Sequence, residues 1–353
     1  MTASTSEIRI GYKNIGSGEP VFIIAEAGVN HNGDLELAKK LVDAAAEAGA
    51  DAVKFQTFRA QELVSAATPK ARYQADTTGT NESQFEMIKR LELTPDAHRV
   101  LVEHCRKLKI LFLSTPFDVE SADLLETFDM PAYKVPSGEI TNWPFLRHIA
   151  SKHKPVILST GMSDLKEVEE AVSVLRAAQC SELVILHCTS SYPTPPASVN
   201  LRAMQTMADK FKVPVGLSDH TAGIEVALAA TALGACVVEK HFTLDRSLPG
   251  PDHQASLEPD DLRSLVRGIR MVEAALGDGQ KHAVQAEQDV KNVARRSIVA
   301  HRTIPQGSYI TNDMLVFKRP GTGIPPSRVS AVIGRKATRT IQGDTLVQFE
   351  DLE

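Results

Sequence analysis

The stretch VFIIAEAGVNHNGDLELAKKLVDAAAEAGADAVKF, residues 21–55, contains the unit that decides the fold. It begins with a short apolar run, continues with an amphipathic segment and ends in a second apolar run. Apolar runs of this length suit strands that are buried on both faces, and such strands occur in parallel sheets whose connections are helices. Residues 21–55 therefore predict a strand, a helix and a second, parallel strand.

The amphipathic segment carries signals for both ends of a helix. Asp34 is suited to cap residues 35–48, apolar side chains recur along one face of that run, and Gly49 is suited to end it. Later in the chain, Pro259 suits the first position of a helix that stops near Gly277. Both segments are therefore predicted to be helices that pack one face on a core.

The same unit recurs along most of the chain. Apolar runs, each followed by a helix-like segment, lie at residues 21–25, 52–55, 110–113, 132–135, 156–158, 183–186, 215–217 and 236–238. Eight strand–helix units over about 250 residues are what a (β/α)8 barrel requires, with its site at the carboxyl ends of the strands. A doubly wound parallel sheet is the competing fold on pattern alone. We expect the barrel.

The two ends of the chain depart from this repeat. Residues 8–21 alternate like strands and are predicted to form a hairpin over the barrel floor. The catalytic barrel is expected to span residues 1–279, and a polar linker to span residues 280–294. Residues 295–353 contain short β-like runs, in which IPQGSYITNDML and IQGDTLVQFEDL loosely repeat, and are predicted to form a small second domain.

Composition and charge exclude several classes of protein. The 353 residues include 39 Lys and Arg against 44 Asp and Glu, and both signs are scattered, so we expect no nucleic acid partner. The chain has neither an export signal nor an apolar stretch long enough to span a membrane, which predicts a cytoplasmic protein. The four cysteines lack zinc spacing and are predicted to be reduced and buried.

Polar residues follow all eight apolar runs, and in a barrel these residues meet at one rim. Lysines and hydroxyl groups are prominent among them, and together they suit an anion such as a phosphorylated acid. Each lysine taken alone is also explained as a surface side chain. The candidates for this anion site are Lys54, Lys134, Lys240, Ser137, Ser159 and Ser218.

A pair of histidines at the same rim suggests a metal. His220 and His241 follow neighbouring strands at matching offsets, so both imidazoles are predicted to reach one divalent ion, which would polarise a carbonyl oxygen. Two ordinary hydrogen-bonded histidines are the alternative, and the residues alone favour it. His31, His187 and His253 are open to either interpretation.

Ten motifs, in order along nearly the whole chain, carry a resemblance to a known family. They are FIIAEAGVNHNG (22–33), VKFQTF (53–58), FLSTPFD (112–118), YKVPSGEI (133–140), ILSTGM (157–162), LHCTSSYPTP (186–195), GLSDHT (216–221), EKHFT (239–243), GPDH (250–253) and KRPGTGI (318–324). The chain resembles the sialic acid synthase family, the bacterial nonulosonate synthases. This resemblance implies a TIM barrel followed by an antifreeze-like (SAF) domain.

The resemblance also implies a reaction. Phosphoenolpyruvate condenses with an acylated aminohexose, N-acetylmannosamine in the main interpretation, and gives N-acetylneuraminate and phosphate by C–O cleavage. The implied cofactor is Mn²⁺ or Mg²⁺ on His220 and His241, which makes the metal interpretation of this pair the stronger one. The implied catalytic residues are Glu26, Lys54, Lys134 and Asp252, with the choice between the two carboxylates for proton transfer left open.

Further residues of the motifs are implied to contact the substrates. They are Gln56, Thr115, Ser137, Ser159, Ser190, Tyr192, Ser218 and Arg319. Ser190 stands where some family members carry asparagine, which puts that one contact in doubt. Arg319 matches an arginine that reaches from the tail of one subunit into the barrel of its partner, so the resemblance implies a domain-swapped homodimer.

Other functions remain open at this point. A legionaminate synthase, which takes 2,4-diacetamido-2,4,6-trideoxymannose, shares AEAGVNHNG and a segment like residues 70–74, whereas a pseudaminate-type enzyme fits EAGVNHNG less well. A metal-independent aldolase would use Lys134 or Lys240 to form a Schiff base with pyruvate. In a non-enzymatic interpretation, the tail is a carbohydrate-binding or ice-binding module on an inert scaffold.

Overall fold

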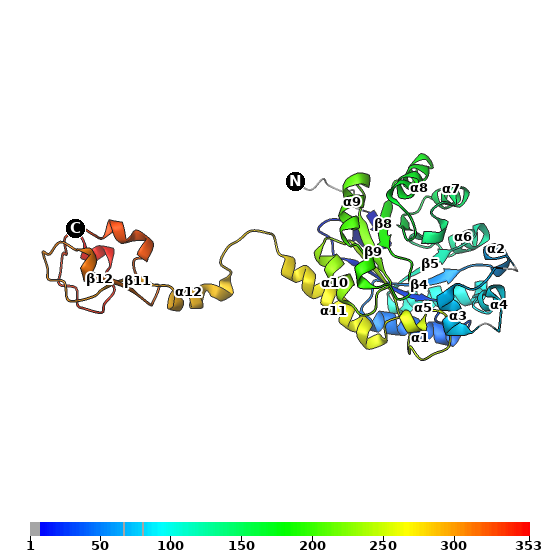
Figure 1. Cartoon of the computed structure of the whole chain (residues 1–353), viewed down its shortest axis with the longest axis horizontal. Helices are drawn as coiled ribbons and strands as arrows, with labels where there is room; N and C mark the ends of the chain where they lie inside the picture. Colours follow the sequence, from blue (N-terminus) through cyan, green and yellow to red (C-terminus); the bar gives the residue numbers. More distant parts are fainter. Residues whose placement is uncertain (1–7, 66–67, 80) are drawn as a thin grey trace. The chain divides into compact units, whose positions relative to one another are not determined.

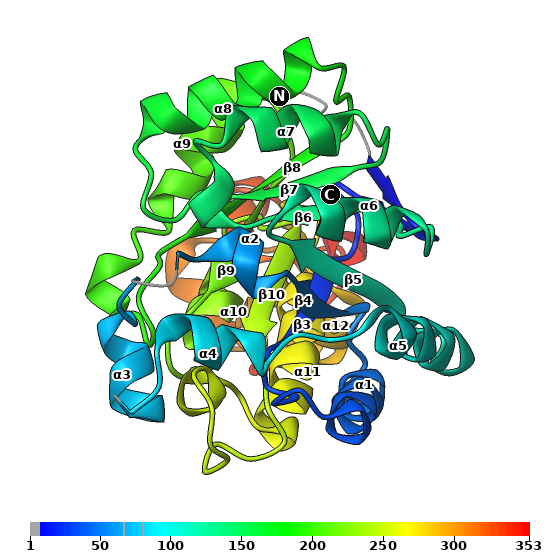
Figure 2. The same cartoon turned by 90° about the vertical axis from the view of Figure 1, so that its right-hand side faces the viewer.

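One sheet of eight parallel strands forms the centre of the barrel unit, in a computed structural model that describes residues 8–65, 68–79 and 81–353 (Figures 1 and 2). Residues 1–7, the start of the predicted barrel domain, lie outside the described residues. The strands are β3 (Phe22–Gly28), β4 (Ala52–Thr57), β5 (Leu111–Pro116), β6 (Tyr133–Val135), β7 (Val156–Ser159), β8 (Leu183–Cys188), β9 (Val215–Asp219) and β10 (Val237–His241).

The order of these strands distinguishes a barrel from an open sheet. It runs β5-β4-β3-β10-β9-β8-β7-β6, so that sequence neighbours pair and the last strand returns to the first. β5 and β6, at the two ends of this order, lie side by side. The sheet is therefore a nearly closed barrel, and the predicted fold is confirmed over the doubly wound sheet.

Helices follow the strands and surround the barrel (Figure 2). Asp34 caps the first of them by accepting hydrogen bonds from the backbone N–H groups of Glu36 and Leu37, and Gly49 ends it with a φ of 83°. The apolar faces of the helices and the outward faces of the strands share one core. The helices are α1 (Leu35–Ala48), α5 (Pro95–Leu108), α6 (Val119–Glu126), α7 (Trp143–Ala150), α8 (Leu165–Ala177), α9 (Arg202–Phe211), α10 (Glu225–Ala232) and α11 (Pro259–Leu276).

The half of the barrel interior in which the strands begin is filled with apolar side chains. Phe22, Ile24 and Leu113 belong to this cluster, together with isoleucines of an antiparallel hairpin formed by β1 (Ile8–Ile10) and β2 (Lys13–Ile15). The hairpin thus closes the end of the barrel at which the strands begin. The polar side chains that point into the barrel lie at the opposite end, where the strands finish.

The connection between β4 and β5 is the longest in the barrel and contains three short helices. They are α2 (Ala60–Leu63), α3 (Arg72–Thr78) and α4 (Gln84–Lys89), which precede α5 and were not predicted individually. Helices of four to seven residues are too short to show a clear apolar period. Side chains of α2 and α4 form a separate apolar cluster with Val29 and Phe58.

The second compact unit spans Asp278–Glu353. It begins with α12 (Gln288–Ala294), which lies in the predicted linker and buries none of its side chains. β11 (Ser297–Ala300) pairs antiparallel with β12 (Leu315–Lys318), and Ile304 bridges to Ile341, so the first residues of the two repeated stretches pair with each other. A small apolar core, including both of these isoleucines, holds the unit together.

Three further observations concern the chain as a whole. In the described ranges, no helix combines the length and the apolar character that crossing a membrane requires. All four cysteines are buried and free of disulfide bonds. Short 3-10 turns join several elements, at Ser137–Glu139, Pro196–Ser198, His253–Ala255, Gln285–Glu287, Asn312–Met314, Pro326–Ala331 and Phe349–Asp351.

Candidate active site

A cavity of about 750 Å³ opens at the carboxyl ends of the barrel strands. It brings together all the site residues predicted in the barrel except Lys240, namely Glu26, Lys54, Gln56, Thr115, Lys134, Ser137, Ser159, Ser190, Tyr192, Ser218, His220, His241 and Asp252. Arg319, which was predicted in the tail, belongs to the second unit, where its side-chain Nε donates a hydrogen bond to the carbonyl of Ala294 at 3.0 Å. A polar site therefore exists at the rim where the barrel fold predicts it.

Two buried lysines and two buried carboxylates form the floor of this cavity. Lys54 Nζ lies 2.6 Å from Glu26 Oε2 and 3.6 Å from Glu239 Oε2, and it donates a hydrogen bond to Thr115 Oγ1 at 2.8 Å. Lys134 Nζ lies 3.6 Å from Glu239 Oε1. All four charged side chains are at most 5% exposed, so an anion bound here would meet the two ammonium groups with little water between them.

The protonation of these groups follows from burial and from their mutual charges. Burial raises the pKa of the Glu26 carboxyl, although Lys54 opposes it. Burial also acts to raise the pKa of Glu239, but Lys134 and Lys54 outweigh it and hold that pKa below its usual range. Burial acts to lower the pKa of Lys54, and the two carboxylates raise it above its ordinary value, whereas burial lowers the pKa of Lys134.

Glu239 belongs to this network but was not among the predicted site residues. It accepts a hydrogen bond from Ser218 Oγ at 2.8 Å in addition to its contacts with the two lysines. It lies two residues before His241 on β10, and residues two apart on a strand point to the same side. Because His241 points into the barrel, this spacing means that the Glu239 carboxylate points into the barrel as well.

Two serine hydroxyl groups that line the cavity differ in their hydrogen bonding. Ser137 Oγ accepts a hydrogen bond from the backbone N–H of Gly161 at 2.9 Å. Ser159 Oγ is buried and has no hydrogen-bond partner among the described residues. Because a buried hydroxyl group without a partner is costly, Ser159 indicates that a ligand supplies an acceptor at this position.

The two predicted metal ligands lie together at the mouth, with ring centroids 5.4 Å apart. His220 Nδ1 donates a hydrogen bond to the carbonyl of Thr189 at 2.9 Å, which leaves the lone pair on Nε2. His241 Nδ1 is buried, has no hydrogen-bond partner in the described part of the chain and lies 3.9 Å from Asp252 Oδ2. Burial and the neighbouring His220 hold the pKa of His241 well below its usual value, so this ring is neutral.

This donor set fits a divalent cation. Neutral imidazoles with outward lone pairs are common metal ligands, and the carbonyl behind His220 is the kind of group that orients such a ligand. In residues 8–65, 68–79 and 81–353, no cluster of three or more His, Cys, Asp or Glu side chains has the geometry of a metal site. A cation on two imidazoles would therefore keep coordination positions open for substrate and water.

Three further side chains border the histidine pair. The ring of Tyr192 lies with its centroid 4.2 Å from that of His220 and 5.9 Å from that of His241, so it packs beside the pair. Gln56 Nε2 donates a hydrogen bond to Glu26 Oε1 at 3.3 Å. Burial raises the pKa of Asp252 to about 6, which brings its protonation change close to neutral pH.

Lys240 does not join the anion site, contrary to the sequence analysis. Its Nζ lies 2.7 Å from Asp219 Oδ2 and donates a hydrogen bond to the carbonyl of Thr221 at 2.5 Å. It lies between Glu239 and His241 on β10, and side chains alternate along a strand, so it points toward the helices. The amine that a Schiff base through Lys240 would need is thus held in a buried ion pair.

The three histidines that were left open lie outside the cavity lining. His31 Nδ1 accepts a hydrogen bond from the backbone N–H of Gly33 at 2.9 Å. His187 Nε2 donates to the carbonyl of Val199, and His253 Nδ1 lies 2.7 Å from Thr243 Oγ1. Each of them holds a loop or strand end in place.

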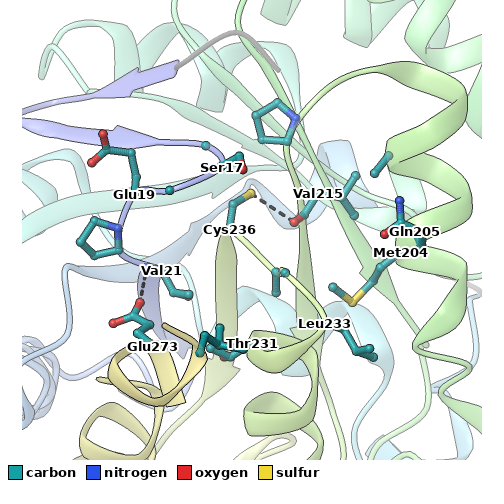
Figure 3. A pocket seen from close by; sticks show the side chains of 18 of the residues that line it. Ser17, Glu19, Val21, Met204, Gln205, Val215, Thr231, Leu233, Cys236 and Glu273 are labelled. Carbon is teal, nitrogen blue, oxygen red and sulfur yellow. Dashed lines mark hydrogen bonds between the residues drawn. The ribbon is translucent and has the colours of Figure 1, made fainter. Parts of the chain in front are cut away.

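A second cavity, of about 850 Å³, lies at the end of the barrel where the strands begin (Figure 3). There Glu273 accepts a hydrogen bond from the backbone N–H of Val21 at 2.5 Å, and Cys236 Sγ donates to the carbonyl of Val215 at 3.1 Å. Its described lining includes one lysine, Lys212, and no histidine. Its polar groups serve local structure, so the mouth cavity is the candidate active site.

The chain is similar to known proteins over nearly its whole length. Residues 41–281 match the NeuB family and residues 295–353 match the SAF domain. The chain is 51% identical over 328 residues to the N,N'-diacetyllegionaminic acid synthase of Campylobacter jejuni, covering 92% of this chain and 98% of that protein. It is 49% identical over 347 residues to the enzyme of the same name from Legionella pneumophila, covering 97% and 98%.

A solved structure is similar as well. It is the crystal structure of N-acetylneuraminic acid (sialic acid) synthetase from Leptospira borgpetersenii in complex with citrate, with a TM-score of 0.72 and 38% sequence identity. The alignment covers 81% of this chain and 95% of that chain.

Proposed function

The chain belongs to the NeuB family and ends in a SAF domain, and on that premise we propose that it condenses phosphoenolpyruvate with 2,4-diacetamido-2,4,6-trideoxymannose. The products are N,N'-diacetyllegionaminate and phosphate. The two relatives named legionaminic acid synthases are 51% and 49% identical to this chain, against 38% for the sialic acid synthetase. This difference favours the diacetamido sugar over N-acetylmannosamine. N-acetylmannosamine is the second candidate sugar.

The observation that carries the proposal is a single cavity that holds the lysine and carboxylate network beside the histidine pair. Lys54 and Lys134 offer two positive charges, which match the phosphate and the carboxylate of phosphoenolpyruvate. The Ser159 hydroxyl group, which has no partner in the described chain, is the donor for one of these anionic oxygens. Binding in this pocket replaces the lost hydration of both groups.

In the reaction, C3 of phosphoenolpyruvate forms a bond to the aldehyde carbon of the open-chain sugar. Water adds its oxygen to C2, and the bond between C2 and the phosphate oxygen breaks, so that phosphate leaves with that oxygen. Lys54 and Lys134 hold the enol ester in place, and this positioning converts an encounter of two substrates into a reaction within one complex. Lys54 remains charged throughout because its carboxylate neighbours raise its pKa.

His220 and His241 are the residues that we assign to a divalent cation, Mn²⁺ or Mg²⁺. Such a cation, when bound, supplies Lewis acidity toward a carbonyl oxygen. The carbonyl of Thr189 keeps His220 in the tautomer that presents Nε2. The ring of Tyr192 packs beside both imidazoles, closer to that of His220 than to that of His241.

Glu26 and Asp252 are the two carboxyl groups placed to move protons. Both oxygens of Glu26 are engaged, one by Lys54 and the other by Gln56. Burial raises the pKa of both carboxyl groups, that of Asp252 to about 6, and both line the same cavity, so the ion pair of Glu26 with Lys54, and not the pKa shift, separates their roles. We therefore assign Asp252 to proton transfer at the sugar hydroxyl groups and Glu26 to the positioning of Lys54.

Arg319 completes the proposal. We infer from the family resemblance that the protein is a homodimer in which Arg319 of one chain contacts the N-acyl group of the sugar bound by the other chain. The cytoplasm is the compartment that we propose for this reaction, because it supplies phosphoenolpyruvate.

Release of phosphate is the direct test. The enzyme is mixed with phosphoenolpyruvate and either 2,4-diacetamido-2,4,6-trideoxymannose or N-acetylmannosamine, with and without a chelator, and His241→Ala is assayed in parallel. We expect metal-dependent phosphate release that is fastest with the diacetamido sugar and lost in His241→Ala. Full activity in chelator would contradict the metal assignment, and no release with either sugar would contradict the reaction.

One observation supports a second candidate function. Burial lowers the pKa of Lys134, which is a property of lysines that form Schiff bases. Trapping of a pyruvate adduct on Lys134 with borohydride, together with activity in chelator, would establish the aldolase instead. We expect no adduct, because Glu239 lies 3.6 Å from this amine and stabilises its charged form.

A further inference from the structure

The active-site cavity continues beyond the charged floor into a region with apolar walls. We call this region the apolar lobe and define it by six of the residues that line it, Val29, Phe58, Val64, Met87, Leu91 and Phe117. Most of these side chains belong to one cluster built by the long connection between β4 and β5. No charged side chain of the described lining comes from this connection.

One polar atom in the lobe is left without a partner. Gln84, on α4, lines the cavity, and its Oε1 is buried with no hydrogen-bond partner in the described residues. Because a buried amide oxygen without a hydrogen-bond partner is costly, we expect a ligand to donate a hydrogen bond to it.

A relay of hydrogen bonds determines which end of the Gln84 amide faces the cavity. The backbone N–H of Ala71 donates to Gln74 Oε1 at 3.0 Å, which identifies that atom as an acceptor. Gln84 Nε2 donates to the same oxygen at 3.3 Å. Since the NH₂ group of Gln84 is held by Gln74, the group left over is the carbonyl oxygen. The lobe therefore offers one acceptor surrounded by apolar carbon.

From this arrangement, and resting on the proposed function, we propose that the apolar lobe is the subsite for the C4 acetamido and C6 methyl groups of the sugar. The acetamido N–H donates to Gln84 Oε1, and both methyl groups pack on the apolar walls. The aldehyde at C1 is bound near the histidine pair, so C4 and C6, the carbons remote from it, are the ones that extend into the lobe.

The same chemistry disfavours the alternative sugar. N-acetylmannosamine carries hydroxyl groups at C4 and C6, and it would bring two hydrated groups against mainly apolar walls, where Gln84 Oε1 is a buried acceptor without a partner among the described residues. A polar group buried without a partner loses its hydrogen bonds to water. Apolar pockets discriminate by about 10- to 200-fold for such small differences, so we expect a preference of about that size for the diacetamido sugar.

The test compares Gln84→Leu with the unmodified enzyme on both sugars. Leucine keeps the size of the side chain and removes the acceptor, so we expect kcat/KM for the diacetamido sugar to fall about 10-fold. The KM for phosphoenolpyruvate should stay unchanged, because its site is the lysine network. Gln61→Leu is the matched control, since Gln61 is exposed on α2 and lies outside the cavity lining, and it should leave both constants unchanged.

A second variant covers the case in which Gln84→Leu does not fold. Val64→Thr keeps the shape of the wall and adds a hydroxyl group, and it should reduce the preference for the diacetamido sugar by about three-fold or more. An unchanged preference in whichever variant folds, with a normal rate in the unmodified enzyme, overturns the subsite alone. No phosphate release from the unmodified enzyme with any sugar overturns the proposed function instead.

Discussion

Each buried charge at the mouth of the barrel depends on a partner. Lys54 contacts two carboxylates and Glu239 contacts two lysines, so neither sign is left alone in the interior. Removal of one partner from such a group leaves an uncompensated buried charge, which destabilises a protein strongly. The most informative substitutions here therefore change a charge while keeping its shape.

Glu239→Gln is such a substitution. Glutamine keeps an acceptor for Ser218 but withdraws the negative charge between Lys54 and Lys134, so the two ammonium groups repel each other and shift. We expect kcat/KM for phosphoenolpyruvate to fall by about 100-fold or more in a phosphate-release assay. Glu170→Gln, a change on the surface helix α8, is the control, and an equal loss in both variants would contradict the role of Glu239.

His31 leads to a prediction about stability and pH. Burial, with His98 as the next influence, lowers the pKa of His31 from 6.5 to about 4. Between these two values the unfolded chain binds a proton that the folded chain does not, so the stability from this group is complete above pH 6.5 and is lost as the pH falls toward 4. The difference corresponds to about 3 kcal/mol in the free energy of unfolding.

Urea unfolding at several pH values checks this prediction. Trp143 is the one tryptophan of the chain and lies on α7, so its fluorescence reports on the barrel unit. The free energy of unfolding should fall less steeply between pH 6.5 and 4 in His31→Gln than in the unmodified protein. The exposed His282, changed to Gln, should leave the slope as it is, and equal slopes in all three proteins would refute the assignment.

Among the elements, the loop after β7 shows how backbone shape positions side chains of the site. Gly161 lies in this loop and donates its N–H to Ser137 Oγ. A Cβ at Gly161 would come within 2.2 Å of Ser190 Oγ and 2.8 Å of Ser137 Oγ. Both contacts involve the ends of small side chains, which can move, so a larger residue would displace the serines rather than prevent folding.

Gly161→Ala is therefore expected to leave the fold intact and to damage the anion site. Displacement of catalytic contacts by about 1 Å can cost 100-fold in rate, and we expect a 10- to 100-fold loss of kcat/KM for phosphoenolpyruvate. Gly138→Ala is a close control, because a Cβ at Gly138 has no heavy atom within 4 Å. Similar kinetics for the two variants would show that the loop geometry does not matter.

The whole molecule consists of two compact units, Met1–Gly277 and Asp278–Glu353. The proposed role of Arg319 requires the second unit of one chain to serve the barrel of another. Arg319→Ala should therefore raise the KM for the sugar far more than the KM for phosphoenolpyruvate, as steady-state kinetics on both substrates would measure. An equal effect on both constants would contradict a contact to the sugar.

Mixed dimers test the same idea. Arg319→Ala and His241→Ala are each expected to be inactive at low sugar concentration, but a dimer of one chain of each type contains one complete site. If subunits exchange at random, about a quarter of the full activity should return on mixing. No recovery would favour a tail that acts on its own subunit.

Much of the fold could be predicted from local sequence patterns. Residues 35–48 are a helix with Asp34 and Gly49 at its ends because capping and left-handed glycine act within a few residues. The eight strands were found because burial on both faces requires continuous apolar runs. The short helices α2, α3 and α4 were missed because they are too short to show an apolar period of their own, and α2 and α4 are held by packing on each other.

Most residues of the candidate site could be predicted from the sequence, but the contacts among them could not. The strand ends pointed to Glu26, Lys54, Lys134, His220 and His241, and all of them line one cavity. Their roles, the dimer and the domain boundaries at 279 and 295 stay predictions. The exclusion of Lys240 and the importance of Glu239 could not be predicted with confidence in a fold whose inward face was not yet known.

The sequence by itself determined which segments are strands and helices, and it placed polar residues at one rim, because these properties depend on neighbours along the chain. Only the tertiary structure decided which side chains meet. The contact of Lys54 with both Glu26 and Glu239 joins three strands, and the orphaned Gln84 oxygen depends on a hydrogen-bond relay through another helix. Charge, burial and hydrogen bonding act through space, so their balance exists only once the barrel has closed.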